Sequence, residues 1–463
     1  MTETLFADRR DRIVQPVDQI LPIPRLAVLG LQHVLVMYAG AVAVPLIIGR
    51  ALQLPPQQVA LLISADLFAC GLATLVQSLG LPGVGVRLPI MMGVTFASVG
   101  PMMALIMAGA ASHTPGADTL QLIYGSVIAA GVFGLFAGPV ISRVARLFPP
   151  VVTGVVILVI GVTLMNIGIQ WAAGGQPSDP DFGSPLHLGV SAVVLAVVLV
   201  ITRFTKGLLN HCAVLIGVIV GCALAAAAGK MTFETFAAAP LFSLVRPFQF
   251  GMPRLEPVPI LTMCLVMIVV MVESLGMFFA VGEMVGRPLD RAAISRGLRG
   301  DAFGTILGGV FNTFPYTSFS QNVGLVGVTG VRSRYVCVAG GLIMMLLGLS
   351  PKLAALVAAA PSFALGGAGL VMFGMVAATG IRILGKVDYA ANRNNLFIVA
   401  ISVGIGLTPL LAGNFFQFLP PALGPLLNSG VLLSMLSSAT LNLFYNGLGK
   451  SASSSDPIPA DTP

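Results

Sequence analysis

Long apolar runs separated by short polar connections form the main pattern of this chain. From Leu26 to Leu448, runs of about 18 or more largely apolar residues recur, and runs of that length can cross a bilayer as helices. The runs do not alternate apolar and polar positions, which excludes a transmembrane β-barrel. A soluble protein could not bury so many apolar stretches. We therefore predict an all-α polytopic membrane protein.

The apolar runs divide into about fourteen segments, seven on each side of the longest polar connection. The first seven lie at 26–48, 58–80, 88–110, 119–142, 150–168, 186–202 and 207–229. The second seven lie at 259–281, 300–314, 316–330, 335–350, 361–381, 394–412 and 425–447. An odd number of spans in each half gives the halves opposite orientations, which predicts an inverted repeat.

The same pattern predicts the division of the chain into tails and repeats. We expect an N-terminal tail at 1–24, a first seven-helix repeat at 25–230, a connector at 231–258, a second repeat at 259–447 and a C-terminal tail at 448–463. The N-terminal tail is polar and charged, which is unlike a cleavable signal peptide.

The basic residues predict an orientation in the membrane. If the spans alternate, all but five of the 24 Lys and Arg residues fall on the side of the N-terminus. The exceptions are Arg50, Lys230, Arg246, Arg254 and Lys352. Lys and Arg collect in cytoplasmic loops, so both termini are expected in the cytoplasm. The net charge of +7 then reports topology rather than nucleic-acid binding. The five cysteines lie in apolar segments without metal-binding spacing, so no metal or cofactor is expected.

The third segment of each half is interrupted at a matching position. The segments read LPIMMGVTFASVGPMM (88–103) and FPYTSFSQNVGLVGVTG (314–330), and each suggests a short extended piece followed by a half-helix. Extended backbone at membrane depth needs hydrogen-bond partners, and a half-helix offers free N–H groups and a positive dipole end. We predict a polar pocket between the two breaks; the alternative is that Gly and Pro only kink ordinary helices.

Few ionisable residues lie inside the predicted spans, and four of them are candidates for a functional role. Glu273 is flanked by apolar residues in VMIVVMVESLGMFF. A carboxylate exposed to lipid is costly, so we expect Glu273 to face the interior of the helix bundle and to have a functional role. Asp301 lies near the expected start of its helix, as a terminal acid paired with Arg299 or as a proton-coupling site. Asp66 either contacts a neighbouring helix or is functional. His33 is expected to support the site.

Two adjacent amides, Gln321 and Asn322, complete the candidate site. An amide both donates and accepts hydrogen bonds, whereas an ionised carboxylate only accepts them. Together they suit a planar heterocycle with alternating N–H and C=O groups along its edge, as when amide side chains bind nucleobase edges. Glu273 would accept ring N–H groups, and Gln321 would pair with an adjacent N–H and C=O.

Three motifs carry a resemblance to a known family. The stretches GLQHVLVMYAG, VESLGMFFAVGEMVGRP and QNVGLVGVTG resemble the first-helix Gln-His motif, the eighth helix and the signature of the nucleobase–ascorbate transporter family, the xanthine/uracil permeases. The similarity spans nearly the whole chain. One departure is Gly330, which follows Thr329 where many members have Arg or Lys.

The resemblance implies a fold and an activity. The fold is two inverted sets of seven helices, with short extended strands in helices 3 and 10. A core domain of helices 1–4 and 8–11 carries the site, and a gate domain of helices 5–7 and 12–14 moves against it. The activity is proton-coupled uptake across a bacterial inner membrane by a homodimer. Gln321 and Ser274 resemble the urate and xanthine carriers, so the expected substrate is one of these purines.

The resemblance also implies a set of site residues. The expected substrate-binding residues are Glu273, Gln321, Phe96, Ser320 and Phe319. Phe96 is expected in the extended piece of helix 3, and Phe319 and Ser320 in the extended stretch before the signature, with Ser320 at its end. The expected site-supporting or proton-coupling residues are His33, Asp301 and Asn322.

Two other kinds of protein are alternatives to this assignment. An inorganic anion transporter or exchanger could share the architecture, but it has little use for a buried carboxylate opposite the amides. An intramembrane aspartyl protease would use Gly300-Asp301 as half of its motif, but it needs two facing carboxylates and the sequence offers no partner motif. We therefore expect a transporter and no enzymatic activity.

Overall fold

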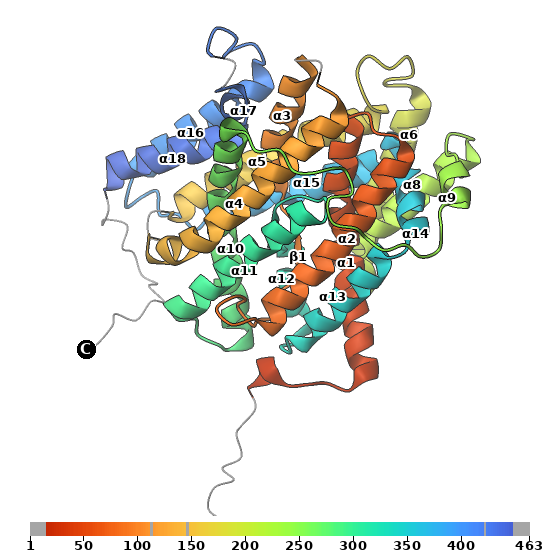
Figure 1. The fold of residues 1–463 in the computed structure, drawn as a ribbon. Helices are drawn as coiled ribbons and strands as arrows, with labels where there is room; N and C mark the ends of the chain where they lie inside the picture. The colour runs from red at the N-terminus through yellow and green to blue at the C-terminus, as the bar shows by residue number, and fades with distance from the viewer. Residues whose placement is uncertain (1–14, 112–113, 145–147, 421–422, 448–463) are drawn as a thin grey trace, which may run out of the picture.

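The computed structural model describes residues 15–111, 114–144, 148–420 and 423–447. Within these residues the chain forms fourteen consecutive segments, seven in each half (Figure 1). The first half contains α1 (Ile23–Ala51), α2 (Pro56–Leu79), β1 (Met92–Val94) with η2 (Phe96–Ser98) and α3 (Val99–Ala111), α4 (Gly116–Val144), α5 (Pro150–Ala173), α6 (Pro185–Phe204) and α8 (Ala213–Ala227). The C-terminal tail and most of the N-terminal tail lie outside the described residues.

The second half repeats this order. It contains α10 (Pro257–Val285), α11 (Arg291–Val310), β2 (Tyr316–Ser318) with α12 (Ser320–Thr329), α13 (Tyr335–Gly348), α15 (Ser362–Leu384), α16 (Asn394–Leu411) and α18 (Gly430–Asn446). Short helices lie between these segments: η1 (Pro16–Asp18), α7 (Leu208–His211), α9 (Glu234–Ala238), α14 (Pro351–Ala358) and α17 (Gly424–Leu427). Among the described residues, eight helices are long and apolar enough to cross a membrane, and a ninth span forms if α13 and α14 count as one bent span.

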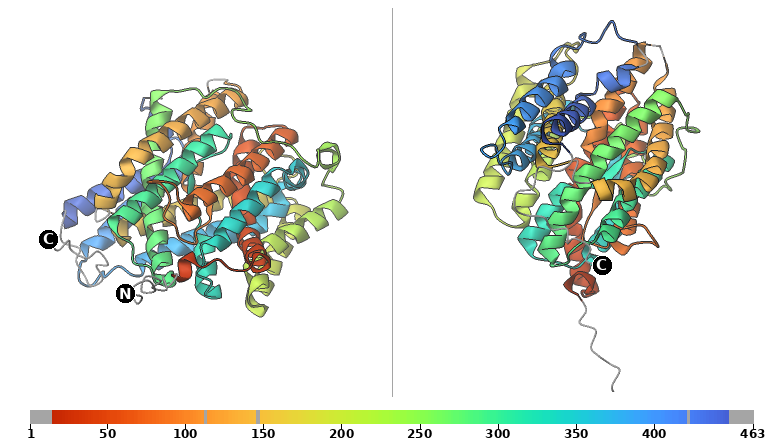
Figure 2. Two further views of the ribbon diagram at one scale, coloured as in Figure 1. Left: turned by 60° about the horizontal axis from the view of Figure 1, so that its bottom comes forward. Right: turned by 90° about the vertical axis from the view of Figure 1, so that its left-hand side faces the viewer.

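Packing separates the segments into two bodies. The core consists of α1–α4 and α10–α13, in which α4 packs on α11 and α2 packs on α13. The gate consists of α5, α6, α8, α15, α16 and α18, and its most extensive contact joins α5 to α15. Figure 2 (right) shows the blue α16 and α18 on one side and the green α10 and orange α4 on the other. The predicted core and gate are confirmed.

The helix contacts occur in matching pairs. By order in the chain, α1, α2 and α4 of the first half correspond to α10, α11 and α13 of the second. The α2–α13 contact therefore has the α11–α4 contact as its counterpart, and the α1–α13 contact has the α10–α4 contact. In the gate, the α6–α8 contact becomes α16–α18. The α5–α15 and β1–β2 contacts map onto themselves. Such pairing is what a pseudo-two-fold axis between inverted repeats produces, so the predicted inverted repeat is confirmed.

The two extended pieces pair with each other across this axis. β1 and β2 are antiparallel, with Met92 opposite Ser318 and Val94 opposite Tyr316. One threonine from each half continues the pattern: Thr74 Oγ1 accepts from the Met92 N–H at 2.9 Å, and Thr305 Oγ1 accepts from the Tyr316 N–H at 3.1 Å. The strands therefore satisfy the backbone groups that a broken membrane helix leaves free.

Two expected boundaries at the breaks are corrected. Ser320 is the first residue of α12 rather than the end of a strand, and Phe319 is the extended residue before it. Phe96 begins the 3-10 turn η2, because β1 already ends at Val94. Gly330, where the family often has a basic residue, ends α12 with φ of +64°, a left-handed conformation that glycine adopts without strain.

The position of Asp301 is a larger correction. α11 begins at Arg291, so Asp301 lies in the middle of this helix and is fully buried. The acid at the helix N-terminus is Asp290, whose Oδ1 accepts from the Ala293 N–H at 2.6 Å. Arg299 Nε donates to the Leu135 carbonyl at 3.3 Å instead of pairing with Asp301. The terminal-acid interpretation of Asp301 was therefore wrong.

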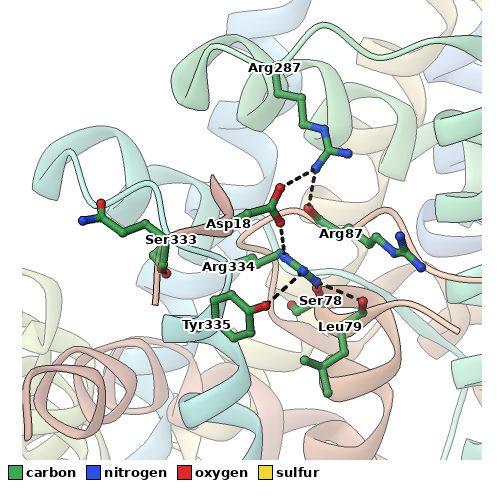
Figure 3. Close-up of polar contacts among 9 residues, drawn as sticks. Asp18, Ser78, Leu79, Arg87, Arg287, Ser333, Arg334 and Tyr335 are labelled. Carbon is green, nitrogen blue, oxygen red and sulfur yellow. Dashed lines mark hydrogen bonds and ion pairs between the residues drawn. The ribbon is translucent and has the colours of Figure 1, made fainter. Parts of the chain in front are cut away.

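A polar cluster fixes the start of the described chain to the core (Figure 3). Arg334 Nε donates to Asp18 Oδ1 at 2.6 Å, and Arg287 Nη1 lies 3.9 Å from Asp18 Oδ2. Arg334 Nη1 also donates to the carbonyls of Ser78 and Leu79, at 2.8 and 2.9 Å. These carbonyls end α2 and have no partner within the helix, so Arg334 caps α2 while it holds the N-terminal segment.

We expect Arg334→Ala to destabilise the protein by about 2 kcal/mol, because it removes a charge-assisted pair and two carbonyl caps. The measurement is the thermal unfolding midpoint of purified protein in detergent. Lys230→Ala is the control, since its ion pair with Asp181 is largely exposed and should contribute little. Equal midpoints for the two variants would contradict the capping role.

Candidate functional site

A cavity lies where the strands end, between core and gate. The residues predicted to bind substrate all line it: Phe96, Glu273, Phe319, Ser320 and Gln321. The remaining lining residues are Val94, Ala97, Ile157, Ile160, Met277, Thr317, Ser318, Val376 and Thr379. The structure thus brings together residues that are more than 200 positions apart in the chain, and it adds a gate wall from α5 and α15.

The polar side chains of the cavity have hydrogen-bonding capacity to spare. Glu273, on α10, has no hydrogen-bond or ion-pair partner among the described residues, so both carboxylate oxygens can accept from a ligand. Gln321 Oε1 accepts from Ser320 Oγ at 3.2 Å, and in the described part of the chain its amide nitrogen has no acceptor. Ser320 and Gln321 also form the first turn of α12, where backbone N–H groups lack helical partners.

Aromatic rings form one side of the cavity. The rings of Phe96 and Phe319 have centroids 6.5 Å apart, and Phe96 meets Phe373 edge-on at 5.9 Å. Phe319 packs so closely on Gly40 that an added Cβ there would lie 2.7 Å from its ring, and Gly93 is as tightly packed. The two glycines therefore let the Phe319 ring lie flat against the core.

His33 and Asn322 lie beside the cavity rather than in its lining. Asn322 Nδ2 donates to the His33 carbonyl at 3.0 Å and lies 3.1 Å from His33 Nδ1. Both side chains are buried. Because His33 is on α1 and Asn322 on α12, this pair ties the first turns of the half-helix to the first span.

Asp301 is connected to the cavity through one residue. Its Oδ1 accepts from Ser318 Oγ at 3.4 Å, and Ser318 lines the cavity. The neighbour of Glu273 reaches the same strand, since the Ser274 and Thr317 hydroxyl oxygens lie 3.1 Å apart. β2 therefore lies between the two carboxylates and hydrogen bonds to the helix of each.

Sequence reasoning missed Gln77, which holds Asp301 from the other side. Gln77 Nε2 donates to Asp301 Oδ1 at 2.9 Å and to the Gly297 carbonyl at 3.1 Å, and its Oε1 accepts from the Val86 N–H at 3.1 Å. The available signal was an amide inside the otherwise apolar helix α2, where a buried polar group must find partners.

A second, small and more apolar cavity shares Glu273 with the first. It follows the start of α5, from Phe148 and Val152 to Ile160, and also touches Met435 on α18. Near the far ends of α1 and α5 the core and gate are in contact. There Arg50 Nη1 donates to Ser362 Oγ at 2.9 Å, its Nη2 donates to the Ala360 carbonyl, and its guanidinium lies 5.7 Å from the Trp171 ring centroid.

An inverted repeat with two broken spans facing a cavity between core and gate defines a polytopic membrane transporter. Solved structures share this fold. The transmembrane domain of the cyanobacterial bicarbonate transporter BicA is similar with a TM-score of 0.62 at 13% identity, covering 92% of this chain and 100% of that one. SLC26A9 is similar with a TM-score of 0.61 at 14% identity, covering 92% and 67%.

Sequence comparison gives the family. A family model described as "Permease family" (Xan_ur_permease) matches residues 24–413. The uric acid transporter UacT of Escherichia coli is 52% identical over 95% of this chain and 89% of its own length. The xanthine permease and the uric acid permease PucJ of Bacillus subtilis are each 42% identical, over 91% and 90% of this chain and 94% and 92% of their own. The chain belongs to the xanthine/uracil permease family, which confirms the resemblance and a transporter rather than an enzyme.

We expect Gln77→Leu to destabilise the protein by about 2 kcal/mol, because the buried Asp301 carboxyl would lose its amide donor. Thermal unfolding in detergent measures this. Gln57→Leu, an exposed position on the same helix, is the control and should unfold like wild type. An unchanged midpoint for Gln77→Leu would mean that Asp301 does not need this donor.

Proposed function

We propose that this protein is a proton-coupled symporter that imports a purine base, urate or xanthine, across a bacterial inner membrane by alternating access. The observation that carries the proposal is the unpaired Glu273 carboxylate facing the same cavity as the Gln321 amide, beside two phenylalanine rings. The names of the relatives, a uric acid transporter and xanthine and uric acid permeases, support the substrate class. Assembly as a homodimer remains an expectation from the family.

The cavity chemistry matches a purine edge. Glu273 accepts hydrogen bonds from ring N–H groups, and Gln321 pairs with an adjacent N–H and C=O through its amide. Phe96 and Phe319 provide apolar surface for the flat ring system, which prefers offset or edge-on aromatic contacts. The positive end of α12 favours carbonyl oxygens or negative charge on the ligand.

Proton coupling is proposed for Glu273 and Asp301. A carboxylate among apolar helices is costly, and a proton removes its charge. Asp301 hydrogen bonds to Ser318, and Ser274 beside Glu273 contacts Thr317, so a change at either carboxylate reaches the same strand. The proton gradient supplies the driving force, and the proposal includes no cofactor.

Alternating access is supported by the two ends of the core–gate boundary. Because successive spans cross the membrane in opposite directions, α5, the fifth span, starts on the same side as α1. The distribution of basic residues assigns this side, with both termini, to the cytoplasm. The second cavity follows this end of α5 to Glu273, whereas Arg50 joins core and gate at the opposite end. This arrangement fits a conformation that is closed toward the outside.

An anion transporter remains the alternative because BicA and SLC26A9 share the fold. That likeness concerns the fold alone at 13% and 14% identity. Glu273 in the cavity disfavours a simple inorganic anion, since its carboxylate accepts hydrogen bonds and such an anion has no ring N–H groups to donate them.

We expect Glu273→Gln to lower urate and xanthine uptake by about 10- to 100-fold, because it removes a charge-assisted acceptor. Gln321→Glu should reduce uptake or shift the purine preference, because it replaces donors with acceptors. Radiolabelled uptake in a strain without its own purine carriers measures both, at equal amounts of protein in the membrane. Glu283→Gln, exposed on the same helix as Glu273, is the control. Wild-type uptake by both site variants would remove these residues from the site.

We expect Asp301→Asn to impair accumulation against a concentration gradient more than purine binding, because the amide carries no exchangeable charge for coupling. Proton-gradient-driven uptake into vesicles should fall about 10-fold, while the binding affinity in detergent changes about 3-fold or less. Asp181→Asn, at an exposed position, serves as the control. Unchanged concentrative uptake by Asp301→Asn would exclude a coupling role.

A further inference from the structure

Asp66 is a third buried carboxyl that the proposed mechanism does not use. It lies on α2, is fully buried, and forms no ion pair with any described residue. Its Oδ1 accepts from Thr313 Oγ1 at 2.9 Å and from the Tyr316 hydroxyl at 2.8 Å. Its Oδ2 is buried without a hydrogen-bond partner in the described part of the protein. A buried polar atom left unpaired is costly, so the presence of this carboxyl requires a reason.

The partners of Asp66 lie where the second strand begins. Thr313 and Tyr316 lie on either side of Phe314 and Pro315, and Tyr316 is the first residue of β2. The Asp66 carbonyl oxygen lies 2.9 Å from the same Tyr316 hydroxyl and shares its single proton with Oδ1. On the other side the Tyr316 N–H donates to Thr305 on α11. Side-chain and backbone contacts therefore hold the start of β2 between α2 and α11.

The first strand residue of the other repeat has no corresponding contact between its side chain and a carboxyl group of the described residues. β1 begins with Met92, whose N–H donates to Thr74 just as that of Tyr316 donates to Thr305. Met92 has no side-chain hydroxyl, and the contact to its carbonyl comes from the Cys70 thiol. The carboxyl contact is thus specific to β2, the strand that leads into Phe319 and Gln321.

We propose that Asp66 is a positioning residue for the substrate site. By accepting from Tyr316 and Thr313 it fixes the start of β2, and so it determines how far Thr317, Phe319 and Gln321 extend into the cavity. This role requires an acceptor at Oδ1 and does not require a proton. Its transport readout rests on the proposed function, because it uses purine uptake.

The test compares Asp66→Asn, Asp66→Ala and Tyr316→Phe. Asparagine keeps an acceptor oxygen, alanine removes it, and phenylalanine removes the donor while keeping the ring. We expect Asp66→Ala and Tyr316→Phe to raise the KM for purine uptake about 10-fold with a smaller change in Vmax. Asp66→Asn should restore the KM to within about 3-fold of wild type. The matched control is Tyr124→Phe, because the Tyr124 hydroxyl is also buried but has no hydrogen-bond partner among the described residues.

A second readout is independent of the substrate. Hydrogen–deuterium exchange of purified protein should speed up at residues 316–322 in Asp66→Ala and Tyr316→Phe, and stay at the wild-type rate in Asp66→Asn and Tyr124→Phe. If Asp66→Ala fails to fold, Tyr316→Phe still carries both measurements.

Three outcomes would overturn the positioning role. If Tyr316→Phe had the hydrogen–deuterium exchange rate and the KM of wild type, the contact between Asp66 and Tyr316 would not position the strand. Loss of uptake in Asp66→Asn together with normal Tyr316→Phe would indicate that Asp66 acts through a proton. Normal exchange in every variant would exclude the role whatever is transported. If wild-type protein takes up no purine, the proposed function fails, and the exchange experiment still decides the role of Asp66.

Discussion

The pairing of two short strands inside the helix bundle is the interaction on which the rest of the structure depends. Extended backbone within a membrane protein must find hydrogen-bond partners in the protein itself. β1 and β2 provide them for each other, and Thr74 and Thr305 complete the set from α2 and α11. Because each strand comes from one repeat, this contact lies on the pseudo-two-fold axis and joins the two halves of the core.

The site follows from where these strands end. β2 leads into α12 and delivers Gln321 to the cavity, while the neighbouring α10 contributes Glu273. The polar groups belong to the core, whose strands and helices hold them rigidly, whereas the facing gate wall is mostly apolar. A ligand held by the core can therefore be covered or exposed by the gate without losing its hydrogen bonds.

Hydropathy predicted the spans well because helix formation in lipid depends mainly on local apolar length. It failed at α11, where the polar run from Arg291 to Asp301 hid the first half of the helix. That half is amphipathic, with Ala293, Ile294 and Leu298 buried and Arg291 and Ala292 exposed, so mean hydropathy does not report its length. The Gly- and Pro-rich breaks were visible, but single boundaries such as Ser320 depend on the strand pairing and were displaced by a residue or two.

The sequence by itself determined the class of fold, the seven-plus-seven organisation and the identity of the candidate polar residues. The length of an apolar run, and a charged residue within such a run, can both be recognised in a short stretch of sequence. Only the tertiary structure decided which polar groups meet: Asn322 with His33, Gln77 with Asp301, and Asp66 with Tyr316. These pairs are more than 200 residues apart in the chain. They depend on how the two repeats pack, which no local pattern of residues records.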